Sequence, residues 1–200
     1  MIDSQIGAWI IFALTIAMSL LGLYATPQLI ERSLFRPYWL LRKRQYDTLF
    51  LSGFVHADLA HLIFNMMTFY FFAFALELRI GTSRFVVLYA LGLTLSELGT
   101  YLKHRNNPHY ATLGASGAIS AVLFASIVYF PNSSLFVFPL PIPIPAPLFA
   151  VGYLAYTYWS ARHPHGRINH DAHFGGALTG LGFVAMTEPS AYRYLLNFLH

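Results

Sequence analysis

The chain of 200 residues contains no cysteine, and only 10% of its residues are charged. Without cysteine it can form no disulfide, no thiolate metal site and no cysteine nucleophile. Ordinary soluble domains have roughly 25% charged residues, whereas apolar residues make up 56% of this chain. The sequence therefore predicts an integral membrane protein with a single membrane domain, 1–200, and no room for a soluble one.

The few charges are unevenly distributed along the chain. Twelve basic and eight acidic residues give a net charge of +4, and five of the basic residues lie between Arg32 and Arg44. A basic cluster beside apolar segments favours contact with membrane lipid headgroups rather than with nucleic acid. The first apolar segment lacks a basic leader and a clear cleavage site, so we expect a retained helix rather than a signal peptide.

Six apolar stretches have lengths near the 17 to 25 residues that cross a bilayer as a helix. They predict an all-α polytopic membrane protein, a bundle of six transmembrane helices at 6–29, 49–76, 85–101, 111–130, 145–160 and 168–187. Between the fourth and fifth stretches, prolines alternate with apolar residues. They are Pro139, Pro141, Pro143, Pro145 and Pro147. This spacing cannot sustain a helix, and it predicts an extended connector.

A candidate nucleophile stands near the start of the fourth stretch, in the sequence Gly114-Ala115-Ser116-Gly117. Gly114 allows the backbone to turn into the helix and approach a substrate closely, which would support the loop around the site. The amide of Ser116, at a helix start, has no intrahelical acceptor and can stabilise an oxyanion. The alternative is that these small residues only allow helices to pack.

The sixth stretch carries a histidine, and an ionisable residue at membrane depth is by default a candidate functional residue. Gly176 and Gly180 form a face that lets another helix approach, and His173 lies on that face. His173 can then act as the general base for Ser116. We expect Asp171 to point elsewhere, which favours a Ser–His dyad. His170, one turn before His173, is either a supporting partner of that histidine or a loop residue, and we favour the loop.

The second stretch supplies hydrogen-bond donors. His61 and Asn65 are four residues apart and hence on one helical face, where an imidazole and an amide suit the stabilisation of an oxyanion. The alternative is that they bond neighbouring helices, which is our preferred interpretation for His56. Asp58 is expected to cap the helix or to lie at the membrane interface.

With these residues in place, the chain resembles the rhomboid family of intramembrane serine proteases over nearly its whole length. The resemblance rests on Gly114-Ala115-Ser116-Gly117, on Ala172-His173-x-Gly175-Gly176-x-x-x-Gly180, on His56-x4-His61-x3-Asn65 and on Glu77-x3-Gly81-x3-Phe85. It implies a six-helix fold with Ser116 as nucleophile, His173 as base, and His61, Asn65 and the Ser116 amide as oxyanion hole. It also implies hydrolysis, without metal or cofactor, of a peptide bond in or near the transmembrane helix of a substrate protein.

Two positions depart from the family pattern. Many rhomboids have an aromatic residue four positions after the serine, packed on the catalytic histidine, whereas this chain has Ser120. The imidazole must then be oriented in another way. The Trp-Arg pair often seen before the second helix is also absent, so the first loop need not follow the family.

Two signals disagree on orientation. The first, third and fifth connections carry nine basic residues and the opposite side three, which by the positive-inside rule places the mouth of the site in the cytoplasm. The family implies a mouth facing away from the cytoplasm, and we follow the family. We expect a multi-pass protein of a bacterial inner membrane, and the sequence predicts no oligomeric state.

Two other functions remain as alternatives. A non-catalytic rhomboid-like protein would use the same fold to hold membrane helices, although such proteins are expected to lack the serine or the histidine. A metal or cofactor protein could use His56, His61, His170 and His173, but the sequence contains no His-Glu-x-x-His zinc motif.

Overall fold

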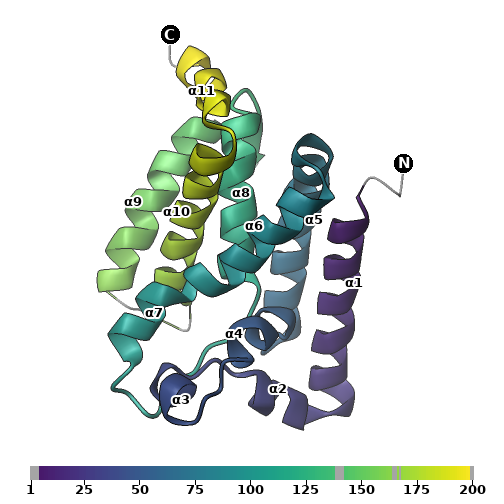
Figure 1. Ribbon diagram of the computed structural model, residues 1–200, viewed down its shortest axis with the longest axis vertical. Helices are drawn as coiled ribbons and strands as arrows, with labels where there is room; N and C mark the ends of the chain where they lie inside the picture. The colour runs from purple at the N-terminus through teal and green to yellow at the C-terminus, as the bar shows by residue number, and fades with distance from the viewer. Residues whose placement is uncertain (1–4, 138–141, 164–165, 167, 199–200) are drawn as a thin grey trace.

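The computed structural model describes residues 5–137, 142–163, 166 and 168–198. Helix α8 (Ser116–Tyr129) runs through the middle of a helical bundle (Figure 1), and every residue of α8 from Gly117 to Tyr129 is buried. A helix that is apolar on all sides has no solvent-facing stripe and must be surrounded by other helices or by lipid. The other helices are therefore arranged around α8.

Helices α5 (Leu59–Ile80), α6 (Thr82–Leu95) and α10 (His170–Thr187) pack directly against α8. Helix α9 (Ala146–Arg162) packs mainly on α10, and α1 (Ile6–Leu20) packs on α5 and α6. The remaining helical elements are short: η2 (Leu21–Ala25), α2 (Pro27–Ser33), α3 (Pro37–Arg42), α4 (Thr48–Leu51), η3 (Ser52–Phe54), α7 (Glu97–His104), η4 (Pro189–Ala191) and α11 (Tyr192–Phe198). Among them, α7 packs on α10 and joins it to the first connection through α3.

Three helices within the described part of the chain are long and apolar enough to cross a membrane: Ile6–Ala25, Leu59–Ile80 and Thr82–His104. They agree with the predicted membrane protein, but the predicted count of six spans is not confirmed. The fourth predicted stretch, 111–130, yields an apolar helix of only 14 residues. Its first five residues are not helical, because Gly114 has a φ of +121°, outside the right-handed helical region.

The second predicted stretch began at residue 49, whereas α5 begins at Leu59. The reason is a helix cap: the Asp58 carboxylate accepts a hydrogen bond from the His61 amide at 2.7 Å, as a good N-cap residue does. The predicted capping role of Asp58 is thus confirmed. The third predicted stretch, 85–101, corresponds to α6 and α7, which together run from Thr82 to His104 and are interrupted at Ser96.

The fold is not entirely helical. Strands β1 (Ser134–Phe136) and β2 (Pro143–Pro145) form a two-stranded antiparallel sheet, with Leu135 opposite Ile144. The predicted extended connector is confirmed for Pro143 and Pro145, while Pro139 and Pro141 lie outside the described residues. Pro147 was wrongly placed in that connector, because it lies in the first turn of α9, where no amide donor is needed.

A buried carboxylate fastens α1 to α5. Glu77 is fully buried, and its two oxygens accept hydrogen bonds from the Gly7 amide at 3.0 Å and the Ala8 amide at 2.6 Å. These amides belong to the first turn of α1, whose donors lack intrahelical acceptors. A negative charge at this helix end is also favoured by the helix dipole. Glu77 therefore fixes where the first membrane helix begins.

Helices α8 and α10 approach so closely that only glycine fits between them. A Cβ atom added to Gly176 would collide with the backbone of Gly117, and one added to Gly180 would collide with the backbone of Ala121. The predicted close approach through these two glycines is therefore confirmed. Small residues let membrane helices gain dispersion contacts where no hydrophobic effect drives them together.

We predict that Gly180→Leu lowers the melting temperature, because a branched side chain has to separate α10 from α8 at a cost of about 1 to 3 kcal/mol. The matched control is Gly182→Leu, two residues along the same helix, where an added Cβ meets nothing within 4 Å. Thermal unfolding in detergent measures both variants. Equal melting temperatures for the two would contradict the close contact at Gly180.

Candidate active site

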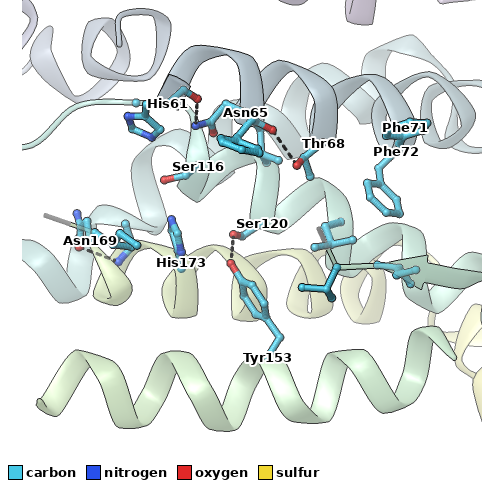
Figure 2. Close-up of a pocket in the computed structure, with 18 of the residues that line it drawn as sticks. His61, Asn65, Thr68, Phe71, Phe72, Ser116, Ser120, Tyr153, Asn169 and His173 are labelled. Atoms are coloured by element: carbon cyan, nitrogen blue, oxygen red, sulfur yellow. Dashed lines mark hydrogen bonds between the residues drawn. The ribbon is translucent and has the colours of Figure 1, made fainter. Parts of the chain in front are cut away.

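All the predicted site residues line one cavity of about 850 Å³. His61 and Asn65 reach it from α5, Ser116 from the start of α8 and His173 from α10 (Figure 2). Gly114 lines it from the turn before α8. Three segments that are far apart in the sequence thus bring their polar side chains to the same space.

The turn before Ser116 is held by two hydrogen bonds. The Gly114 amide donates to the Ser52 carbonyl at 2.8 Å, and the Ala115 amide donates to Nε2 of His56 at 3.3 Å. Ser116 is the first residue of α8. Within the described structure its amide and its hydroxyl have no hydrogen-bond partner. Ser116 therefore offers a free hydroxyl and a free amide at a helix start.

His56 connects that turn to the first membrane helix. Its Nδ1 lies 3.0 Å from the hydroxyl oxygen of Ser19, and this hydroxyl donates to the Phe54 carbonyl at 3.2 Å. Nδ1 must then carry the proton, which leaves Nε2 free to accept from Ala115. Burial, with a smaller effect from nearby His61, lowers the pKa of His56 to about 3. The ring is thus neutral, and the preferred structural interpretation of His56 is confirmed.

His61 and Asn65 lie on the same face of α5, as their spacing predicts. The His61 ring meets the His56 ring nearly edge-on, with centroids 4.9 Å apart. The Asn65 amide donates one hydrogen bond to the His61 carbonyl at 2.9 Å, which leaves its second N–H for another acceptor. Both side chains face the cavity (Figure 2).

Two features of the structure require glycine at position 114. Its φ of +121° is one that side chains with a Cβ rarely adopt, and an added Cβ would lie 2.5 Å from the ring of His61. The backbone at Gly114 was predicted to approach a substrate closely. In the structure it approaches the His61 ring, which packs against the loop.

We expect Gly114→Ala to lower the melting temperature more than Gly81→Ala does. Both glycines have positive φ, which costs about 1 to 3 kcal/mol for other residues, but an added Cβ at Gly81 meets nothing within 4 Å. The difference between the two variants in thermal unfolding isolates the collision with His61. No difference would mean that the ring moves away freely.

The position of His173 depends on how α10 begins. The Asn169 side chain caps this helix by accepting from the Ala172 amide at 3.1 Å, and it also accepts from the Thr100 hydroxyl at 3.0 Å. Its amide group donates to Glu97 of α7 at 3.3 Å. Sequence reasoning missed this network, although an asparagine just before an apolar helix is a recognisable N-cap signal.

Ser116 and His173 face the same cavity, but no hydrogen bond joins them in the described structure. Catalytic hydrogen bonds are often long in the absence of substrate and shorten when it binds. Asp171 bonds to Lys103 at 2.9 Å, so it points elsewhere, as predicted.

The prediction that His170 lies in a loop is wrong. Because Asn169 caps α10, His170 is the first residue of the helix. It is buried, and its ring centroid lies 6.0 Å from that of His173.

Tyr153 of α9 also faces the site, and no sequence pattern indicated it. Its hydroxyl lies 3.1 Å from the hydroxyl of Ser120 on α8. Its ring is within 19° of parallel to the imidazole of His173, with centroids 6.4 Å apart (Figure 2). A residue 37 positions after Ser116 becomes its neighbour only through the packing of α9.

The histidines in the described part of the chain are not grouped as metal ligands. Among the described residues, no group of three or more His, Asp or Glu side chains is placed to hold a metal ion. His56 in particular uses both ring nitrogens in hydrogen bonds to the protein.

A model of the Rhomboid domain matches residues 43–189 of this chain, close to three quarters of its length. The chain belongs to the rhomboid family. It is 38% identical over 80 residues to a Bacillus subtilis protein named "Putative rhomboid protease YdcA", covering 39% of each chain. It is 29% identical to "Rhomboid protein 1, mitochondrial" of Saccharomyces cerevisiae, over 84% of this chain and 50% of that protein. It is 28% identical to "Presenilin-associated rhomboid-like protein A, mitochondrial" of Danio rerio, over 75% of this chain and 40% of that protein.

The matched part of each of these relatives is half of its length or less. Family membership agrees with the apolar helices, and the chain is a membrane protein of the rhomboid family. The cavity described above lies within the part of the chain that matches the Rhomboid domain.

Proposed function

We propose that this chain is an intramembrane serine endopeptidase that hydrolyses a peptide bond in or near the transmembrane helix of a membrane-protein substrate. The observation that supports this most directly is the convergence of a free serine hydroxyl, an imidazole and an amide donor on one cavity. Each group comes from a different helix, and an ionisable residue at membrane depth is by default a candidate functional residue. Membership of the rhomboid family, in which one relative is named "Putative rhomboid protease YdcA", adds to this support.

The chemistry needs only groups of this chain and water. The Ser116 hydroxyl oxygen attacks the carbonyl carbon of the scissile bond while His173 takes the hydroxyl proton. The C–N bond then breaks, His173 gives the proton to the leaving amine, and an acyl-enzyme ester remains on Ser116. Water attacks this ester with His173 again as base, which releases the carboxylic acid and restores the free serine.

In the proposed reaction, three donors stabilise the negative oxygen that forms in each attack. They are the Ser116 amide, the second N–H of the Asn65 side chain and the His61 ring. The start of α8 adds the positive end of the helix dipole. In soluble serine proteases the loss of one such donor costs about 2.7 to 4 kcal/mol in turnover.

The substrate expected for this site is a transmembrane segment that unwinds easily. A carbonyl inside a helix is hydrogen-bonded and screened by the next turn, so Ser116 can reach it only where the helix opens. Glycine and other helix-destabilising residues lower the cost of that opening by about 1 kcal/mol each. Membrane lipids surround both partners, and the basic residues between Arg32 and Arg44 suit contact with their headgroups.

The names of the relatives point to more than one cellular location. Two of the three relatives named above carry mitochondrial names and one is bacterial, which does not support a bacterial inner membrane in particular. We therefore propose that the chain lies either in a bacterial inner membrane or in a mitochondrial membrane. The mouth of the cavity faces away from the compartment in which the chain is synthesised.

We predict that Ser116→Ala abolishes both cleavage of a transmembrane substrate and covalent labelling by a fluorophosphonate, because both need the same hydroxyl. His173→Ala is expected to be as inactive, and the double variant little worse, since the two residues act as a unit. The matched control is Ser126→Ala, which removes a buried hydroxyl without a partner from the same helix and is expected to stay active. Cleavage at wild-type rate by Ser116→Ala would exclude Ser116 as the nucleophile, whereas a wild-type chain that neither labels nor cleaves would favour a non-catalytic, helix-binding role.

Asn65→Ala is predicted to lower kcat by about tenfold to a thousandfold and to change KM little, because the oxyanion exists only after attack. Thr68→Val is the control, since Thr68 lines the same cavity but bonds the Phe64 carbonyl of its own helix. Steady-state cleavage in detergent or liposomes separates the two constants. An effect confined to KM would assign Asn65 to substrate binding instead.

A further inference from the structure

Tyr153 occupies the space between α8, α9 and α10 at the level of the site. Its hydroxyl bonds Ser120, one helical turn after Ser116, and its ring runs alongside the imidazole of His173 (Figure 2). The 6.4 Å between ring centroids and the 19° between ring planes describe an offset, nearly parallel pair. One side chain of α9 thus touches both helices that carry the proposed dyad.

The tyrosine ring has little freedom of its own. It packs against Phe124 of α8 and Phe149 of α9, with ring centroids 5.5 Å away in both cases. Its hydroxyl, at the far end, is tethered to Ser120. A side chain that is packed along its ring and bonded at its tip has one rotamer available.

The His173 ring, by contrast, has no hydrogen bond to fix it in the described structure. Its orientation depends on its neighbours, which are Tyr153 and, nearly edge-on at 80°, His170. A general base must aim one nitrogen at the nucleophile, and an error of about 1 Å in such a geometry can cost about a hundredfold in rate. The packing around the imidazole therefore matters for the reaction.

We propose that Tyr153 is a positioning residue: tethered to Ser120, its ring holds the His173 imidazole in the orientation in which it takes the proton of Ser116. The proposal rests on the proposed function. It also accounts for Ser120 at a position where many rhomboids have an aromatic residue, because a small hydroxyl there leaves room for a ring supplied by α9 and anchors it.

Four variants test the proposal through the rate of fluorophosphonate labelling and through kcat and KM for cleavage. Tyr153→Ala is expected to lower the labelling rate and kcat by about tenfold to a hundredfold, with little change in KM. Tyr153→Phe keeps the ring and Ser120→Ala keeps the tyrosine, so each is expected to lose only about threefold to tenfold. Their double variant should lose no more than either one, since both remove the same hydrogen bond.

Tyr158→Ala is the matched control, because Tyr158 lies on the same helix but faces the cleft beside Arg162, outside the site cavity. A rescue adds a readout that a general packing role would not produce. Ser120→Tyr in the Tyr153→Ala background returns an aromatic ring to the same space from α8, and it is expected to recover at least part of the lost kcat.

Wild-type labelling together with unchanged rates in all the Tyr153 and Ser120 variants would overturn the positioning role and leave the protease function standing. The same conclusion follows if the whole loss appears in KM, or if Tyr158→Ala is as slow as Tyr153→Ala. A wild-type chain that neither labels at Ser116 nor cleaves would overturn the protease function itself, and the role of Tyr153 with it.

Discussion

The near-contact of the α8 and α10 backbones at Gly176 and Gly180 is the constraint on which the site depends. Ser116 lies at the start of α8 and His173 one turn before Gly176, so the distance between the two helix axes sets the distance between the two side chains. Among the residues that the structure describes, no hydrogen bond or ion pair links the two helices. The distance between them is held by backbone atoms in van der Waals contact, which resist compression steeply and leave no space for adjustment.

Close packing fixes the separation of the helices, but hydrogen bonds at their ends fix how far each slides along its axis. Asn169 ties the start of α10 to Glu97 and Thr100 on α7. His56 ties the turn before α8 to Ser19 of α1. Glu77 ties the start of α1 to α5 in turn. Because hydrogen bonds require partners within about 3 Å, a slip of one residue along a helix breaks them.

Sequence patterns predicted the parts of this structure that depend on local chemistry. Ser116, His173, His61 and Asn65 were found because hydroxyl, imidazole and amide groups stand out in apolar stretches, and their spacing predicts the face on which they lie. Gly176 and Gly180 were found for a similar reason. Helix ends were predicted less well: α5 begins ten residues late because Asp58 caps it, and α8 begins late because Gly114 has a positive φ.

Tyr153 shows what a local pattern cannot reveal. The local sequence does not distinguish Tyr153 from Tyr156 and Tyr158, two tyrosines that lie within five residues of it on the same helix. What distinguishes it is which face of α9 packs against α8, and that depends on the surfaces of two helices at once. The same holds for the strands, since β1 pairs with a proline-rich segment whose extended form was predictable but whose partner was not.

The polar groups of the bundle fall into two sets by their hydrogen bonds. Those that hold helices together, such as His56, Glu77 and Asn169, use their polar atoms within the protein. Ser116 and the ring of His173 do not, and both face the cavity rather than a packed interface. An unpaired group alone indicates little, because Ser126 and His170 each have a buried polar atom without a partner, and neither residue lines that cavity.

What is informative is the combination of a polar group without a hydrogen-bond partner and a position on the cavity wall. A hydroxyl and an imidazole without partners face the same cavity, where a substrate carbonyl and its leaving amine would supply those partners.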